Sequence, residues 1–229
     1  MNEWINLHAY TPVQLFFNGL GCVFWLLAYV VLVVRIVRMR FVEMPAMVAG
    51  ANFGWEIVWS LCFHPSTGRL FSWMYAGAAL LDVFIFWSLL RFGTRQFTSE
   101  PRRRVFQGLC ALNLLIWLVV CYSARAEGLD DELGARSGYV INVILSYTSL
   151  TLMLRLSSVY RFSSALGLFR ALGTGFISVS IVLIYPDSRF LHVLCAACAV
   201  LDGAFVIMLG AARRRERLAG ATVVRAALT

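Results

Sequence analysis

The stretch AGANFGWEIVWSLCF, residues 49–63, places a carboxylic acid, Glu56, in the middle of an apolar run. Two further runs do the same: YAGAALLDVFIFW (75–87) carries Asp82, and LCAACAVLDGAFVIML (194–209) carries Asp202. An ionised carboxylate in a membrane span costs at least about 2.5–3.5 kcal/mol, so such residues usually face a protein interior and serve a function. The three acids are therefore the first candidates for functional residues.

The composition is that of a polytopic membrane protein. The 229 residues are 60% hydrophobic and only 14% charged, and the mean hydropathy is +0.76. The formal net charge of +8 does not indicate nucleic-acid binding, because the basic residues are not gathered on one soluble face. All 20 basic residues are arginines. The absence of lysine excludes a retinal or pyridoxal Schiff base, and with it a seven-helix photoreceptor.

Seven apolar segments follow one another along the chain. A transmembrane helix needs about 20 predominantly apolar residues, and each segment approaches or exceeds that length. We therefore predict an all-α fold, with a single seven-helix transmembrane domain over 1–211 and a basic cytoplasmic C-terminal tail over 212–229. The segments are 13–34, 45–63, 71–91, 105–123, 138–156, 165–185 and 190–211.

The connections between the segments alternate in charge. Several arginines follow the first, third, fifth and seventh segments, whereas the other connections carry single arginines and the acidic loop AEGLDDELGARSG (126–138). Cytoplasmic loops carry an excess of arginine and lysine. The pattern predicts a multi-pass protein of the cell membrane with its N-terminus outside and its C-terminus in the cytoplasm.

An internal similarity links the third and seventh segments. HPSTGRLFSWMYAGAALLD (64–82) resembles YPDSRFLHVLCAACAVLD (185–202) with one residue deleted, and the alignment pairs Asp82 with Asp202. The two segments run in the same direction, so a 3+1+3 pseudo-repeat is topologically allowed. Chance similarity between two apolar helices is the competing explanation.

The second segment carries a polar and aromatic stripe. Asn52, Trp55, Glu56 and Trp59 follow at i, i+3, i+4 and i+7, which places them on one helix face. We expect this face to form a pocket wall; the alternative is a polar cluster that only bonds neighbouring helices. The candidate substrate-binding residues are these three non-acidic members together with Phe86, Asn113, Trp117 and Asn142.

The acids and the aromatic residues suggest one chemistry. Counted from the helix ends, Glu56 lies about 12 Å deep and the two aspartates about 18 Å deep, so all three can line one cavity. No basic residue in the interior of the same spans pairs with them, so at least one acid is expected to stay protonated. A neutral acid in a dry site is a general acid. Aromatic faces stabilise cations, so such a site could protonate an alkene or epoxide and shelter the carbocation.

The segment Asn52-Phe53-Gly54-Trp55-Glu56, with Leu81-Asp82 and Leu201-Asp202, resembles the small integral-membrane terpene cyclases of meroterpenoid and indole-terpenoid biosynthesis. The similarity covers nearly the whole chain, and the arginine-only basic content favours the actinobacterial drimentine-type branch. The resemblance implies that Glu56 and Asp202 are essential. A further acid that often precedes the final aspartate in this family is missing, since 195–200 holds none.

The resemblance also implies the substrate: a farnesyl or longer prenyl chain on an aromatic head such as an indole. The chain has no Asp-Asp-x-x-Asp run to bind a magnesium diphosphate and no Asp-x-Asp-Asp motif. We therefore predict no metal and no cofactor, and as partners only a small prenylated substrate and membrane lipid, without nucleic acid or an obligate protein partner.

We predict a protonation-initiated membrane terpene cyclase, of isomerase or lyase type, in which Glu56 donates the proton. Asp202 would tune or reprotonate Glu56, and Asp82 would be a third wall acid or the final base. The alternative is a small proton- or cation-coupled transporter with midplane acids. Such transporters have helices broken by proline or glycine, whereas the five prolines here lie near helix ends.

Overall fold

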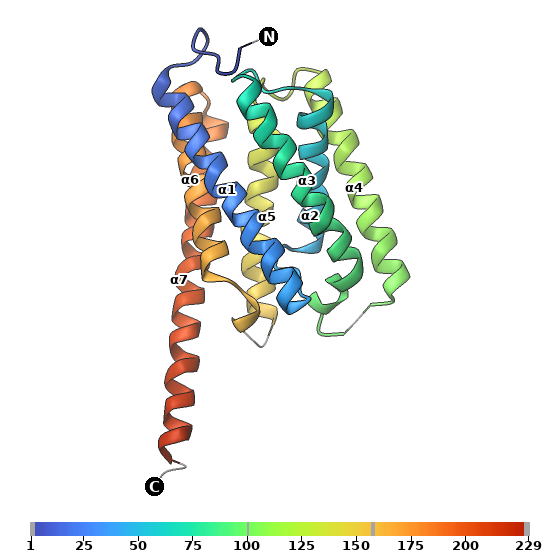
Figure 1. Ribbon diagram of the computed structural model, residues 1–229, viewed down its shortest axis with the longest axis vertical. Helices are drawn as coiled ribbons and strands as arrows, with labels where there is room; N and C mark the ends of the chain where they lie inside the picture. Colours follow the sequence, from blue (N-terminus) through green and yellow to red (C-terminus); the bar gives the residue numbers. More distant parts are fainter. Residues whose placement is uncertain (1–2, 100, 157–158, 227–229) are drawn as a thin grey trace.

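The computed structural model describes residues 3–99, 101–156 and 159–226, and in this part of the chain it contains seven α-helices and no strand (Figure 1). Six of the helices are long and apolar enough to cross a membrane; the exception is α2. The predicted all-α, multi-span fold is confirmed. The helices are α1 (Pro12–Met39), α2 (Ala46–Ile57), α3 (Arg69–Phe92), α4 (Arg103–Ala126), α5 (Ala135–Arg155), α6 (Ser164–Ile184) and α7 (Arg189–Ala226).

The second helix differs from the regular span expected over 45–63. Its α-helical part has 12 residues, and a π-helical turn, Val58–Cys62, follows before the backbone becomes extended at Phe63. Turns of this kind inside helices are frequent at functional sites. The irregular element is the one that carries Glu56.

The N-terminus of α1 is fixed by a capping box at Thr11 and Gln14. Thr11 caps the helix by accepting a hydrogen bond from the backbone N–H of Gln14, and the Gln14 side chain accepts one from the N–H of Thr11. Pro12 fits the first helical position, where its missing N–H is not needed.

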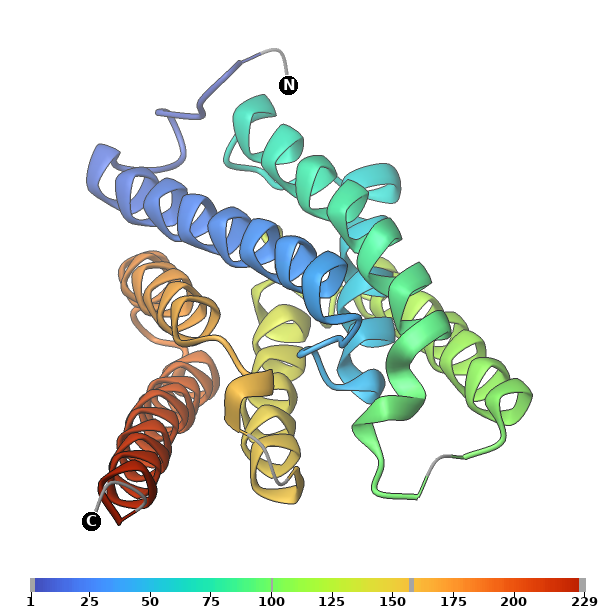
Figure 2. The same ribbon diagram turned by 60° about the horizontal axis from the view of Figure 1, so that its bottom comes forward.

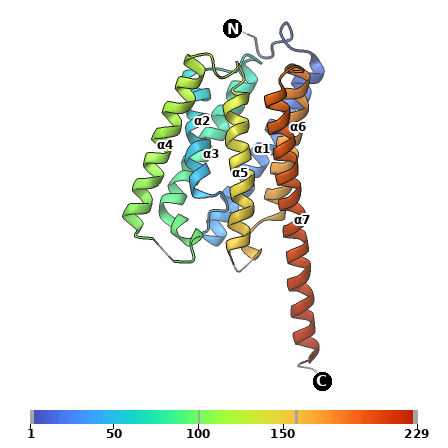
Figure 3. The same cartoon turned by 180° about the vertical axis from the view of Figure 1, so that it is seen from behind.

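The helices form two groups of neighbours. In the N-terminal group, α3 packs against α1 and α2; in the C-terminal group, α7 packs against α5 and α6. Contacts of α1 with α6 and of α2 with α5 join the groups, and Figure 2 shows α1 between α3 and α6. The α4 helix lies at the edge of the bundle against α2 (Figure 3). The most extensive helix contact, between α1 and α6, joins the two groups, and the duplication stays a prediction.

The two termini lie at opposite ends of the bundle (Figure 1). The connections after α1, α3 and α5 lie at the same end as the C-terminus, so the arginine-rich connections gather on one side, as the charge pattern predicts. Which side is cytoplasmic stays a prediction. The α7 helix continues to Ala226 and extends beyond the other helices, so the division predicted at 211 falls inside a helix.

A buried acid ties two connections together at the arginine-rich end. The carboxylate of Glu43 pairs with Arg35 and also accepts a hydrogen bond from the backbone N–H of Ser163 at 2.6 Å. Burial raises the pKa of Glu43, and the opposing effect of the Arg35 charge does not cancel it. This contact holds the α1–α2 connection against the one between α5 and α6.

Candidate active site

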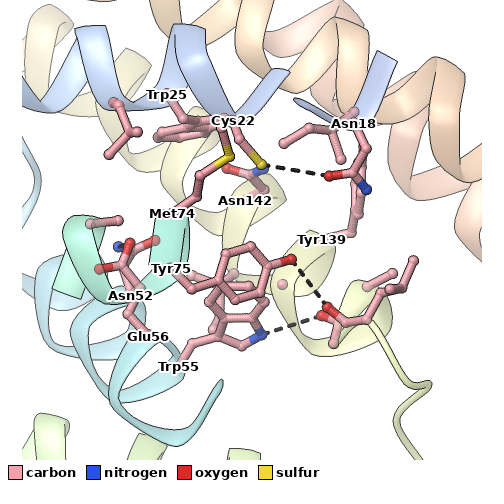
Figure 4. Close-up of a pocket in the computed structure, with 18 of the residues that line it drawn as sticks. Asn18, Cys22, Trp25, Asn52, Trp55, Glu56, Met74, Tyr75, Tyr139 and Asn142 are labelled. Atoms are coloured by element: carbon pink, nitrogen blue, oxygen red, sulfur yellow. Dashed lines mark hydrogen bonds between the residues drawn. The ribbon is translucent and has the colours of Figure 1, made fainter. Parts of the chain in front are cut away.

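A cavity opens among α1, α2, α3, α5 and α6, next to the acid of the second helix (Figure 4). It encloses about 850 Å³ of atom-free space, a figure that includes its open mouth. Its walls are mainly aliphatic and aromatic, with Trp25, Trp55 and Tyr75 as large rings. Glu56 is the only carboxylic acid among the described lining residues.

One face of α1 forms a whole wall of the cavity. Asn18, Cys22, Trp25 and Tyr29 follow at spacings of four, three and four residues, and all four line the cavity. This spacing is visible in the sequence and would have identified the wall. The prediction missed it because it began from the acids, and α1 has none.

Glu56 is held by two side chains at one end of the cavity. The hydroxyl of Tyr29 donates a hydrogen bond to Glu56 Oε1 at 2.5 Å, and Asn52 Nδ2 donates to the same oxygen at 3.2 Å. The two N–H groups of Asn52 Nδ2 are shared among this oxygen and two further acceptors, Tyr29 Oη and Asp82 Oδ2, the latter at 2.8 Å. Tyr29, Asn52, Glu56 and Asp82 therefore form one network, which we call the acid cluster.

The acid cluster contains two buried carboxyl groups and no positive charge. Glu56 and Asp82 are 4% and 1% exposed, and their carboxyl groups lie close enough to interact electrostatically with each other. Among the described residues, no basic side chain forms an ion pair with either acid. Two neighbouring carboxylates in a dry site cannot both be ionised without a large cost. The cluster is therefore suited to hold at least one proton.

The third acid is in a different place. Asp202 does not line the cavity; its Oδ1 pairs with Arg170 Nη2 at 2.9 Å and accepts a hydrogen bond from Ser146 Oγ at 2.7 Å. Arg170 also donates to Ser149 Oγ at 2.8 Å, and its guanidinium lies over the ring of Phe205, 4.9 Å from the ring centre. We call this set the ion-pair cluster.

Two expectations are therefore wrong for Asp202: it has a basic partner, and it does not share a cavity with the other acids. The reason is that Arg170 lies on α6, a helix that carries none of the three acids, so the pairing is not visible within the spans that carry them. Asp82 is also set back from the wall and reaches the cavity through Asn52.

Three predicted binding residues reach the cavity: Asn52, Trp55 and Asn142. The indole N–H of Trp55 donates to the carbonyl of Gly134 at 3.2 Å and to Ser137 Oγ at 3.0 Å, and its ring packs on Tyr75 with 5.2 Å between centroids.

The other four predicted binding residues lie outside the cavity, in contacts between helices. Trp59 is fully buried against Trp55, and Phe86 packs against Phe53. Trp117 lies where α4 approaches Gly54 closely, and Asn113 donates to the carbonyl of Met47 at 2.7 Å. The last two lie on α4, which packs on the outside of α2.

The loop before α5 closes one side of the cavity, where Leu133 and Gly134 line it. Gly134 has φ +69°, and a Cβ there would lie 2.4 Å from the Trp59 ring, so glycine is required. Asp130 fixes the loop by accepting hydrogen bonds from Ser137 and from the backbone N–H of Arg136. Burial raises the pKa of Asp130.

Comparison with known proteins gives one family. The model described as Pyr4-like transmembrane terpene cyclases matches residues 5–215, which is nearly the whole chain and includes every member of both clusters. No curated protein and no solved structure matches the chain.

Proposed function

The chain belongs to the Pyr4-like transmembrane terpene cyclases, membrane enzymes that cyclise terpenoids, and we propose that its reaction begins with proton transfer from Glu56. The observation that carries the proposal is the position of this acid. Glu56 is buried, borders an aromatic-walled cavity, and has a second acid but no cation beside it. An acid kept neutral in such a site is a proton donor.

The reaction conserves all atoms. The O–H proton of Glu56 adds to the CH carbon of the terminal (CH₃)₂C=CH– alkene of the substrate, whose π electrons form the new C–H bond and leave a tertiary cation on the dimethyl carbon. The next alkene along the chain supplies the electrons of the first ring bond. A final C–H bond then gives its electrons to a new alkene and its proton to a base, so that the product is an isomer of the substrate. With an epoxide, the same proton would open the oxygen ring.

Asp82, Asn52 and Tyr29 prepare Glu56 for this step. Tyr29 and Asn52 both donate to Oε1, which leaves Oε2 without a partner in the described structure and available to carry the proton. Asn52 also holds Asp82, which can return a proton to Glu56 after each turnover. We assign Tyr29 and Asn52 as positioning residues.

The aromatic wall protects the cation. Trp25, Tyr29, Trp55 and Tyr75 line the cavity, and their ring faces attract positive charge without reacting as bases. The largely apolar lining keeps out water, which would quench the cation before the rings close.

Asp202 has a structural role in this proposal. Its charge is neutralised by Arg170, and neither residue reaches the cavity. A buried acid that balances a buried arginine holds α6 to α7 and needs no proton of its own.

We propose a farnesylated indole-type molecule as the substrate class. A neutral aromatic head agrees with the absence of basic residues among the described lining residues. The same absence argues against a free diphosphate as the group bound in the cavity.

The test uses membranes that contain the protein, incubated with farnesylated indoles in D₂O. Wild type should yield a product isomeric with the substrate apart from one deuterium, fixed on the former CH carbon of the terminal alkene. Glu56→Gln keeps the size of the side chain but has no acidic proton, so turnover should fall by about 10³-fold. Thr151→Val is the control, because Thr151 is exposed and bonds only within its own helix. Full activity of Glu56→Gln would refute the assignment.

A further inference from the structure

Hydrogen-bonding side chains lie at both ends of the cavity, and Asn142 lies between them (Figure 4). Asn52 and Glu56 are at one end, and Asn18 is at the other (Figure 4). The side chains drawn between them are largely apolar and include Met74 and the ring of Tyr75. The acid cluster accounts for the first end, and nothing in the proton transfer uses the second.

The α1 helix gives the distance between the two ends. Asn18 and Tyr29 both line the cavity and are 11 residues apart, which is close to a whole number of turns. At 1.5 Å per residue their separation along the helix is about 16 Å. Because Tyr29 bonds to Glu56, a ligand that reaches both ends is elongated, with its reacting alkene at one end and a polar group at the other.

Asn18 has hydrogen-bonding capacity that the protein does not use. The residue is only 4% exposed, and its Oδ1 accepts one weak hydrogen bond from the thiol of Cys22 at 3.5 Å. Its amide nitrogen has no partner among the described residues. This nitrogen is not among the fully enclosed side-chain atoms, so its N–H groups face the cavity, where a bound molecule can accept from them. The amide nitrogen of Asn18 therefore has the properties of a donor that a ligand completes.

The surroundings restrict what that ligand group can be. No arginine, lysine or histidine occurs among the described lining residues, so an anionic head would be left without a counter-charge. Tyr139, at the same end, already shares a hydrogen bond with Ser178 at 2.8 Å. The group at this end that remains without a protein partner is the amide N–H of Asn18, and a neutral oxygen acceptor is the partner that suits it.

We infer that Asn18 binds the carbonyl oxygen of a neutral head group and so orients the substrate with its prenyl terminus at Glu56. This inference rests on the proposed function for the identity of the reacting end. The binding of the head is a separate property, and it can be measured without turnover.

The first experiment compares two ligands on unaltered protein. One is a farnesylated indole whose head carries an amide carbonyl; the other has a methylene in place of that carbonyl. For wild type we expect KM to be about three- to tenfold lower for the carbonyl compound, the effect of one neutral hydrogen bond. Equal KM values for the two compounds would overturn the inference without any variant having to fold.

The second experiment assigns the effect to the residue. Asn18→Leu has a similar size but no N–H, so it should remove the preference in KM for the carbonyl compound over the methylene compound. Thr151→Val should keep the preference. If Asn18→Leu weakened both compounds equally, the residue would have only a packing role and the inference would fail.

Binding of unreactive analogues separates this inference from the proposed function. The same two molecules with hydrogenated chains have no alkene to protonate, and their Kd values can be measured on purified protein. Preferential binding of the carbonyl analogue, lost in Asn18→Leu, would support the head site even if no cyclised product formed. Cyclisation by wild type without any preference between the analogues would keep the proposed function and refute the head site.

Discussion

Asp82 and Asp202 follow the same dipeptide pattern, Leu-Asp, in corresponding helices of the two helix groups, and both are almost fully buried. Their neighbours differ. Asp82 lies beside another acid and an amide, whereas Asp202 lies beside an arginine and a serine. The first environment places two carboxyl groups together without a cation, and the second gives the carboxyl group a cationic partner. The comparison teaches that the partner, and not the position in the helix, determines what a buried acid does.

The largest effect is expected when one member of the ion-pair cluster is removed, which tests whether Asp202 depends on its basic partner. Asp202→Leu leaves the guanidinium of Arg170 buried without its counter-charge, which should cost about 3–5 kcal/mol of stability. The double variant Arg170→Leu/Asp202→Leu removes both charges and should recover most of that loss. Thermal unfolding in detergent gives both values. A double variant no more stable than Asp202→Leu would show that the pair is not what makes Asp202 necessary for folding.

The acid cluster should respond in the opposite way, with lost activity and little lost stability. Asp82→Asn keeps an oxygen that can accept from Asn52 but removes the second acid, so kcat should fall about 10- to 100-fold. Single-turnover and steady-state rates, measured on the same membranes, show whether the loss of kcat arises in the first proton transfer or in a later step. A normal first turnover followed by slow later ones would identify Asp82 as the residue that reprotonates Glu56. An unchanged kcat would remove Asp82 from the mechanism.

A smaller effect is expected from Tyr29, which touches Glu56 through a single hydrogen bond. Tyr29→Phe retains the ring on the cavity wall and removes only the hydroxyl, so kcat should fall about three- to tenfold. KM should stay close to that of wild type, because the cavity keeps its shape. A rise in KM without a change in kcat would contradict a positioning role and indicate contact with bound substrate.

The smallest effect is expected outside both clusters. Asn113→Leu removes a hydrogen bond to a backbone carbonyl on α2 but no group that reaches the cavity, so turnover should stay within about threefold of wild type. Asn52→Leu is the matched change inside the acid cluster and should cost considerably more. Equal losses of turnover in the two variants would support the prediction from the sequence that Asn113 binds the substrate.

The fold could be predicted in outline because membrane insertion depends on local composition. A membrane-spanning segment can be recognised from its own apolar residues, without information about the segments that pack against it. All seven helices lie close to the segments predicted from the sequence. The π-helical turn after Ile57 could not be read in this way, since it depends on how α2 packs between its neighbours.

The site could be predicted only for residues that share one face of a single helix, because their spacing in the sequence shows that they lie together. Asn52, Trp55 and Glu56 share a face of α2, and this face meets the cavity as the spacing indicates. Which helix lies opposite each face is a tertiary property. For that reason the pairing of Asp202 with Arg170 was missed, and Trp117 was expected in a cavity from which α4 is separated by α2.

The most direct test of the account is the turnover of Arg170→Leu/Asp202→Leu beside that of Glu56→Gln, measured in the same membranes at equal amounts of folded protein. We expect the double variant to cyclise a farnesylated indole at a rate within about tenfold of wild type, while the rate of Glu56→Gln falls by about 10³-fold. A folded double variant as inactive as Glu56→Gln would contradict it, because Asp202 would then take part in the reaction itself.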